Sequence, residues 1–172
     1  NGYISNISYP IYRESTSKIY IPRYYGLEHY GEVEKNILHK GHDINIEFNG
    51  NLFPYQENII QKYIDFVGNS GGGLLDVEPG KGKTVMGLNI ISKIKKKTLV
   101  VVHKSFLLNQ WKERINQFLP NAKVGLIQGP TVDVENKDIV IGMLQTLCTK
   151  DLPDEIVEQF GLTIYDECHH LS

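Results

Sequence analysis

The sequence contains few cysteines and no long hydrophobic run. Its two cysteines, Cys148 and Cys168, form no Cys-x-x-Cys pair, which argues against a disulfide framework and favours a reducing compartment. The longest purely aliphatic run, Leu99 to Val102, is far shorter than the roughly 20 apolar residues that cross a bilayer. No charged and then apolar leader opens the chain. We therefore expect an intracellular protein with no membrane partner.

The sequence also lacks an excess of one charge. Its 18 Lys and Arg residues face 20 Asp and Glu residues, so the net charge is −2 and any nucleic-acid site must be a local patch. A length of 172 residues with 41% hydrophobic content is enough for a packed core, which excludes a disordered chain. Because the chain begins at Asn1 and stops at Ser172, we expect it to be a piece of a longer protein.

Tyrosines are concentrated at the N-terminus: seven of the ten lie in residues 1–30. Alternating apolar and polar residues at Lys18 to Ile21 and at Ile44 to Phe48 predict strands, and hence a small β-rich module over residues 1–48. Its tyrosines, interleaved with Arg13 and Arg23, could stack on unpaired bases or form a protein-contact surface. They could equally fill a small core.

The second region, residues 49–172, alternates predicted strands with predicted helices. A helix is expected from Pro54 to about Val67, ended by the glycine-rich residues 68–73. Such alternation favours an α/β fold with a mainly parallel sheet, in which ligands bind at the carboxyl ends of the strands. The further strands are predicted at 74–77, 99–102, 124–127, 139–141 and 162–165, and the further helices at 83–94, 105–118 and 153–160.

A phosphate-binding loop is predicted between the strand at 74–77 and the helix that follows. Glycines allow the backbone N–H groups to approach phosphates, the helix start adds the positive end of its dipole, and Lys83 adds a point charge. Thr84 would give a hydroxyl to Mg²⁺. The strict pattern asks for glycine at position 77, where this chain has Val77. The predicted ATP-binding residues of the loop are Pro79, Gly80, Lys81, Gly82, Lys83 and Thr84.

Two acids follow the strand predicted at 162–165. We assign Asp166 to Mg²⁺ and Glu167 to activation of the attacking water, because phosphoryl transfer needs both functions. Neighbouring residues on a strand point to opposite faces, so the two acids share a site only if the strand ends or bends there. An ordinary acidic surface turn is the alternative. The adjacent cysteine and histidines cannot form a tetrahedral zinc site without partners elsewhere.

The order of five motifs resembles superfamily 2 helicases and translocases of the DExH type. The motifs are Tyr55-Gln56, Gly80-Lys81-Gly82-Lys83-Thr84, the run from Val100 to Trp111, the run from Ile139 to Leu147, and Asp166-Glu167-Cys168-His169. The resemblance implies that Gln56 recognises adenine and that His169 links the nucleotide site to movement of nucleic acid. It also implies that Lys104, Ser105, Gln145 and Thr146 contact the nucleic-acid backbone. For Trp111, core packing and base stacking both remain open.

The resemblance also implies a RecA-like domain, preceded here by the small β-rich module, and a second RecA-like domain that supplies arginine fingers. Arg114 is the one arginine after residue 23, so we expect the isolated fragment to hydrolyse ATP hardly at all. Similar sequence segments occur in helicases of large DNA viruses. This resemblance would place the protein in the host cytoplasm or the virion. Two alternatives remain: a phosphate-loop NTPase that acts on a protein or small molecule, and a non-catalytic binding module.

Overall fold

The computed structural model describes residues 10–168 and divides the chain into two compact units, Asn1–Leu38 and His39–Ser172. In the first unit, strands β1 (Arg13–Glu14) and β2 (Ile19–Tyr20) pair antiparallel, and helix α1 (Arg23–Tyr30) follows. A small β-rich module was expected, and β2 lies within the strand predicted at Lys18 to Ile21, but neither β1 nor the helix was predicted. The division falls between Leu38 and His39 rather than at residue 48.

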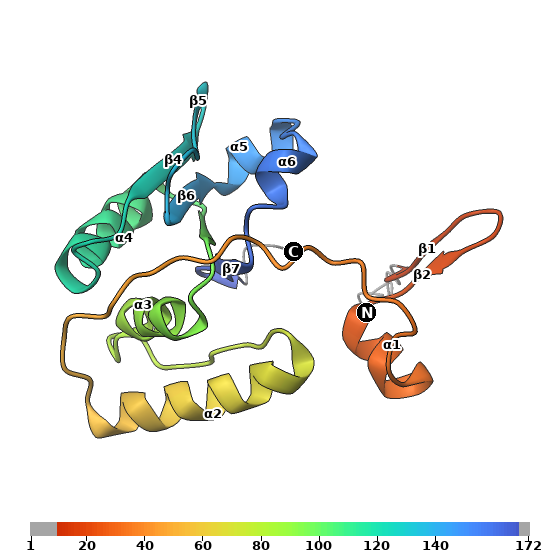
Figure 1. Cartoon of the computed structure of the whole chain (residues 1–172), viewed down its shortest axis with the longest axis horizontal. Helices are drawn as coiled ribbons and strands as arrows, with labels where there is room; N and C mark the ends of the chain where they lie inside the picture. The colour runs from red at the N-terminus through yellow and green to blue at the C-terminus, as the bar shows by residue number, and fades with distance from the viewer. Residues whose placement is uncertain (1–9, 169–172) are drawn as a thin grey trace, which may run out of the picture. The chain divides into compact units, whose positions relative to one another are not determined.

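The second unit is built on a five-stranded sheet in the order β5-β4-β6-β3-β7 (Figure 1). Strands β4, β6, β3 and β7 run parallel to one another, and β5 pairs antiparallel with β4. The expected α/β class with a mainly parallel sheet is thereby confirmed. The strands are β3 (Thr98–Val102), β4 (Val124–Gln128), β5 (Thr131–Asp133), β6 (Ile139–Met143) and β7 (Leu162–Tyr165).

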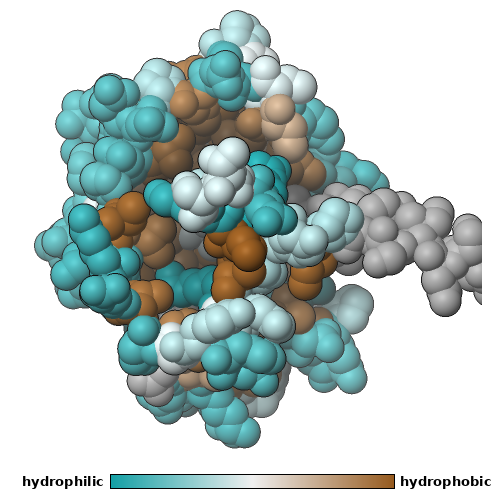
Figure 2. Space-filling model, turned by 90° about the vertical axis from the view of Figure 1, so that its right-hand side faces the viewer, coloured by the Kyte–Doolittle hydropathy of each residue, from teal (hydrophilic) through white to brown (hydrophobic). Residues whose placement is uncertain are grey.

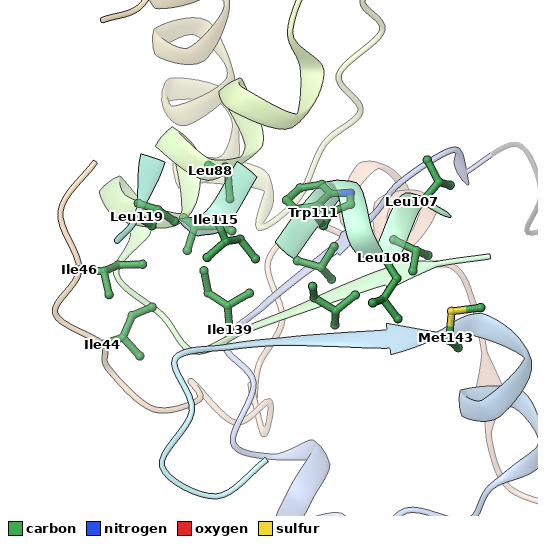
Figure 3. Close-up of a cluster of buried hydrophobic side chains, with 14 residues drawn as sticks. Ile44, Ile46, Leu88, Leu107, Leu108, Trp111, Ile115, Leu119, Ile139 and Met143 are labelled. Atoms are coloured by element: carbon green, nitrogen blue, oxygen red, sulfur yellow. The ribbon is translucent and has the colours of Figure 1, made fainter. Parts of the chain in front are cut away.

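Helices cover both faces of this sheet. Side chains alternate along β3, so Val100 and Val102 pack against α3 (Lys83–Ile94) and α4 (Ser105–Phe118), as Figure 3 shows for the α4 side chains. Leu99 belongs to the opposite cluster, which includes side chains of α5 (Leu144–Thr149) and α6 (Asp154–Val157). Parallel strands buried on both faces explain why β6 is apolar along its whole length.

Helix α2 (Pro54–Ser70) packs on α3 rather than on the sheet. Ile60 of α2 is buried with Met86 and Ile90 of α3. The helix ends at Ser70, within the glycine-rich stretch predicted to end it, and its C-cap Gly71 has a φ of 74°, the left-handed conformation that favours glycine. Proline at its first position agrees with the expected start.

Two predicted strands are wrong. Residues 44–48 form no strand, although Asp43 makes an isolated bridge with Lys96, and Ile44 and Ile46 are buried in the core of the second unit. Their alternation therefore reflects one buried side of an extended segment, not a strand of a separate module. Residues 74–77 pair with no strand among the described residues, and together with β7 they line a cavity.

Apolar side chains are not confined to the core. Figure 2 shows them in recesses of one face, between hydrophilic residues that cover most of it. Within the described residues, no helix is long and apolar enough to cross a bilayer.

Candidate nucleotide-binding site

The predicted phosphate loop connects the extended residues 74–77 to helix α3. Gly80 has a φ of 80° and Gly82 a φ of 82°, both in the left-handed region that favours glycine. Gly82 is the N-cap of α3, so the unpaired N–H groups of the first turn lie directly after the loop. The local geometry is that of an anion-binding helix start, with Lys83 and Thr84 as its first two residues.

The first turn of α2 holds this loop in place. Gln56 is 4% exposed, and its Nε2 donates to the carbonyl of Lys81 at 2.9 Å, while its Oε1 accepts the N–H of Phe53 at 3.0 Å. The hydroxyl of Tyr55 donates to the same Lys81 carbonyl at 3.1 Å. Gln56 therefore caps α2 and braces the loop at once. Its contact with adenine stays a prediction.

An exposed aromatic pair lies beside the loop. The rings of Phe53 and Tyr55 stack with centroids 5.8 Å apart, and Lys81 Nζ lies 5.9 Å from the Tyr55 centroid. No role for the Phe53–Tyr55 pair was predicted from the sequence. The signal that could have found it is an aromatic residue on each side of Pro54 at a helix start.

The two acids are brought together by a turn immediately after β7. The strand ends at Tyr165, the N–H of Asp166 donates to the carbonyl of Val101 at 3.1 Å, and Glu167 has a φ of 56°. This left-handed residue bends the chain where a straight strand would send neighbouring side chains to opposite faces. Asp166 and Glu167 consequently line the same cavity.

That cavity has a volume of about 430 Å³, and of the six predicted ATP-binding residues of the loop only Lys83 and Thr84 line it; the lining does not include residues 79–82. Lys83 Nζ lies 3.9 Å from Glu167 Oε1, with both side chains about one-third exposed. The first two residues of α3 and the acidic turn, which are far apart in the sequence, therefore line one cavity. Residues 73–77 and β7 form its walls, and of the described residues that line it none is an arginine.

The donor set of this cavity fits Mg²⁺. Thr84 offers a hydroxyl and Asp166 a carboxylate, which are oxygen ligands of the kind that magnesium takes together with substrate phosphates. Within residues 10–168, no three His, Cys, Asp or Glu side chains are grouped closely enough to cage a metal. A site of one carboxylate, one hydroxyl and bound phosphate is therefore the arrangement that the residues allow.

Trp111 contacts the acidic turn, which the sequence did not predict. This α4 residue is 2% exposed, and its Nε1 donates to Asp166 Oδ2 at 2.8 Å. Core packing, one of the two interpretations of Trp111, is observed, and the hydrogen bond adds a polar contact to it. A tryptophan inside an apolar helix face gives no sequence signal for such a partner.

The four residues predicted to contact nucleic acid lie at the carboxyl edge of the sheet. Lys104 and Ser105 are exposed at the start of α4, directly after β3. Gln145 Nε2 donates to the carbonyl of His103 at 2.9 Å, and Thr146 Oγ1 accepts the N–H of Gly129 at 3.0 Å. These side chains tie together the segments that follow β3, β4 and β6. His169, predicted to link the two sites, lies outside the described residues.

A family comparison decides the class. The family model described as type III restriction enzyme, res subunit, matches residues 49–172. The chain belongs to this family. The matched range begins just before α2 and includes the phosphate loop, the whole sheet and the acidic turn. The resemblance to superfamily 2 helicases is thereby confirmed.

Individual relatives agree with this assignment. A protein of Acanthamoeba polyphaga mimivirus, named as a candidate ATP-dependent RNA helicase, is 37% identical over 99% of this chain and 33% of its own length. DNA 3'-5' translocase XPB2 of Sulfurisphaera tokodaii is 33% identical over 87% of this chain and 32% of its own. The chain thus spans about a third of the length of these relatives.

A solved structure shares the fold. The Sulfolobus solfataricus SWI2/SNF2 ATPase core in complex with dsDNA has a TM-score of 0.59 and 22% identity, and the match covers 76% of this chain and 28% of that one. The expected RecA-like architecture is therefore confirmed for the larger unit.

Proposed function

We propose that this chain is the first motor domain of an ATP-driven helicase or translocase. The observation that carries the proposal is that Lys83, Thr84, Asp166 and Glu167 line one cavity at the start of α3. A lysine at a helix start opposite two acids is what binding and hydrolysis of a magnesium-bound triphosphate require. The family and the names of the relatives support ATP as the nucleotide.

Each residue then has a defined task. The N–H groups at the start of α3 and the Lys83 ammonium bind the phosphates, while Gly80 and Gly82 allow close approach. Thr84 and Asp166 would hold Mg²⁺, which neutralises charge on the phosphates. Glu167 orients and deprotonates water. Before phosphate binds, Lys83 lies near Glu167, so the ligand competes with this weak ion pair.

The adenine would stack beside the phosphate loop. The exposed Phe53–Tyr55 pair offers an aromatic surface, and Tyr55 is bonded to the loop itself through the Lys81 carbonyl. The remaining N–H of the Gln56 amide is available to a base edge only if the buried side chain shifts, because its other polar groups already bind the protein. We propose stacking on this pair as the main source of base affinity.

Nucleic acid is the proposed track, as DNA or RNA. The exposed Lys104 carries a positive charge beside the start of α4 at Ser105, and this combination suits a backbone phosphate. This helix start follows β3, the strand next to β7, so it shares the carboxyl edge of the sheet with the acidic turn. We further propose that the N-terminal unit contacts nucleic acid or a protein partner through exposed aromatic side chains, among them Tyr12, Tyr20, Tyr24, Tyr25 and Tyr30.

A second RecA-like domain is needed to complete the site. Arg114 lies on α4, where its Nη1 donates to Gln117 Oε1 at 2.8 Å, and it does not line the cavity. An arginine from another domain would supply the missing positive charge, which is worth roughly 10³ to 10⁵ in rate in phosphoryl transfer. The 172-residue chain alone should therefore bind ATP weakly and turn it over hardly at all. The viral origin of several relatives supports a site of action inside an infected host cell.

The test compares ATP turnover of Lys83→Ala and wild type in the full polypeptide that carries this chain, with and without DNA or RNA. Loss of the ammonium should lower turnover by about 10²-fold or more, because the charge acts directly on the phosphates. Lys93→Ala is the matched control, since Lys93 is exposed in the last turn of the same helix. It should leave turnover unchanged.

The same assay separates the alternatives. Turnover that depends on Lys83 but ignores nucleic acid would favour an NTPase that acts on a protein or small molecule. Wild-type turnover no higher than that of Lys83→Ala would leave only a binding module. If nucleic acid binds through phosphate contacts, its affinity must fall as salt rises.

A further inference from the structure

The buried side chain of Trp111, on α4, forms a hydrogen bond with a carboxylate of the acidic turn. Its Nε1 donates to Asp166 Oδ2 at 2.8 Å, so one of the two carboxylate oxygens is already engaged by the protein. The backbone of Asp166 is fixed separately, by its N–H bond to the Val101 carbonyl. Two elements, α4 and β3, therefore define where this carboxylate lies.

The indole itself has little freedom to move. Trp111 is 2% exposed and packs among Leu108 and Ile115 of its own helix and side chains of the sheet (Figure 3). From the other side, α3 approaches closely at Gly87, where an added Cβ would lie 3.2 Å from Trp111 Cη2. The helix that begins at the phosphate loop is thus packed directly against the ring that holds Asp166.

We propose that Trp111 is a positioning residue for the magnesium-binding carboxylate. The inference rests on the proposed function. The indole N–H binds Oδ2, which would leave Oδ1 as the ligand for a metal in the cavity that Asp166 lines together with Thr84 and Lys83. Hydrogen bonds to a ligating carboxylate fix its orientation, and their loss typically weakens metal binding 10- to 100-fold. Because Trp111 lies on the helix that starts at Ser105, the same bond joins the proposed track contact to the nucleotide site.

The first experiment measures Mn²⁺ binding by electron paramagnetic resonance in the presence of a non-hydrolysable ATP analogue, using the full polypeptide. Trp111→Phe keeps an aromatic ring in the core but removes the N–H donor. We expect its Mn²⁺ dissociation constant to rise roughly 10-fold or more. Affinity for the analogue without metal should change little, because the phosphate loop is intact.

The matched control is Leu108→Ala. Leu108 is 4% exposed and lies one turn before Trp111 in the same cluster, but its aliphatic side chain has no hydrogen-bond donor for Asp166. It should lower the melting temperature at least as much as Trp111→Phe and leave Mn²⁺ affinity unchanged. Equal effects of the two variants on Mn²⁺ affinity would show that Trp111 acts only by packing, and would overturn the proposal.

A second measurement does not depend on removing the tryptophan. In the 172-residue chain Trp111 is the one tryptophan, so the emission of this chain reports on the surroundings of that indole, which include the bond to Asp166. Asp166→Ala should shift the emission of the buried indole, and Mn²⁺ with the ATP analogue should quench it in wild type. Gly87→Ala keeps the N–H but presses on the ring, and should weaken Mn²⁺ binding by less than Trp111→Phe does.

The outcomes separate this inference from the function on which it rests. If Lys83→Ala binds Mn²⁺ and the ATP analogue as tightly as wild type does, the proposed function is wrong. The positioning role, which rests on that function, is then wrong too. If wild type binds Mn²⁺ and the analogue tightly but neither Asp166→Ala nor Mn²⁺ alters the Trp111 emission, the positioning role alone is overturned.

Discussion

At the residue scale, the two glycines of the phosphate loop carry different constraints. Both have φ near 80°, where an L side chain costs about 1–2 kcal/mol. An added Cβ at Gly80 meets nothing within 4 Å, whereas at Gly82 it would lie 2.6 Å from Gln56 Nε2. We expect Gly80→Ala to lower the free energy of unfolding by about 1–2 kcal/mol. Gly82→Ala should cost about 1–3 kcal/mol more, from overpacking.

Urea denaturation of the two variants measures this difference, and Gln56→Ala provides the control. In that background the clash at Gly82 is gone while the backbone strain remains, so the two glycine variants should become equally destabilising. Persistence of the difference without the Gln56 side chain would contradict the contact.

The site residues that belong to a sequence motif could be predicted, and the others could not. Lys83, Thr84, Asp166 and Glu167 stand in short patterns whose chemistry is explicit, and the structure brings all four to one cavity. Trp111 and the double role of Gln56 were not predictable. Their partners, Asp166 and Lys81, are distant in the sequence, and only the packing of α4 and α2 brings them together.

At the scale of elements, the start of β3 is held by a buried lysine. Lys97 is 3% exposed, and its Nζ donates at 2.6 Å to both the carbonyl of Val134 and Oε1 of Gln159. Burial lowers the pKa of Lys97 below its ordinary value of 10.5, although Glu135 and Asp138 raise it in part. The folded state thus binds the proton less tightly than the unfolded state does.

This pKa shift predicts a pH dependence of stability. Between the lowered pKa and 10.5 the unfolded chain binds more protons than the folded chain does. The contribution of Lys97 to the free energy of unfolding should therefore rise as pH increases through that window. Below the lowered pKa it should be constant. The measurement is the free energy of unfolding of wild type minus that of Lys97→Met, from pH 7 upward. A difference that falls as pH rises toward 10.5 has the wrong sign and would contradict the shift.

Elements were predicted well where a local pattern matched a packed surface. Helices α3 and α4 and strand β7 have the predicted bounds, because each presents one apolar face to the sheet or lies within it. Helix α1 was missed because its tyrosines have high strand propensity. Residues 74–77 have a strand-like pattern, but a strand also needs a partner, and no described strand is paired with them.

At the scale of the whole molecule, the sheet has two unequal edges. Strand β5 is one edge: it has three residues, and Asp133 and Lys137 form an ion pair of 3.2 Å beside it. Strand β7 is the other edge: it pairs with β3, and half-buried Leu162 and Ile164 lie along it. Short, charged edges resist pairing with another chain, and apolar edges invite it.

The 172-residue chain should therefore self-associate through β7 as its concentration rises. Thr163→Lys adds a charge at an exposed position of this strand, and Thr131→Lys adds the same charge to β5 as the matched control. Sedimentation velocity should show the first variant shifted toward monomer and the second associating as wild type does. If both variants associate equally, the contact lies elsewhere. If neither they nor wild type associate, residues 73–77 already shield β7 across the cavity, and that edge offers no pairing site to another chain.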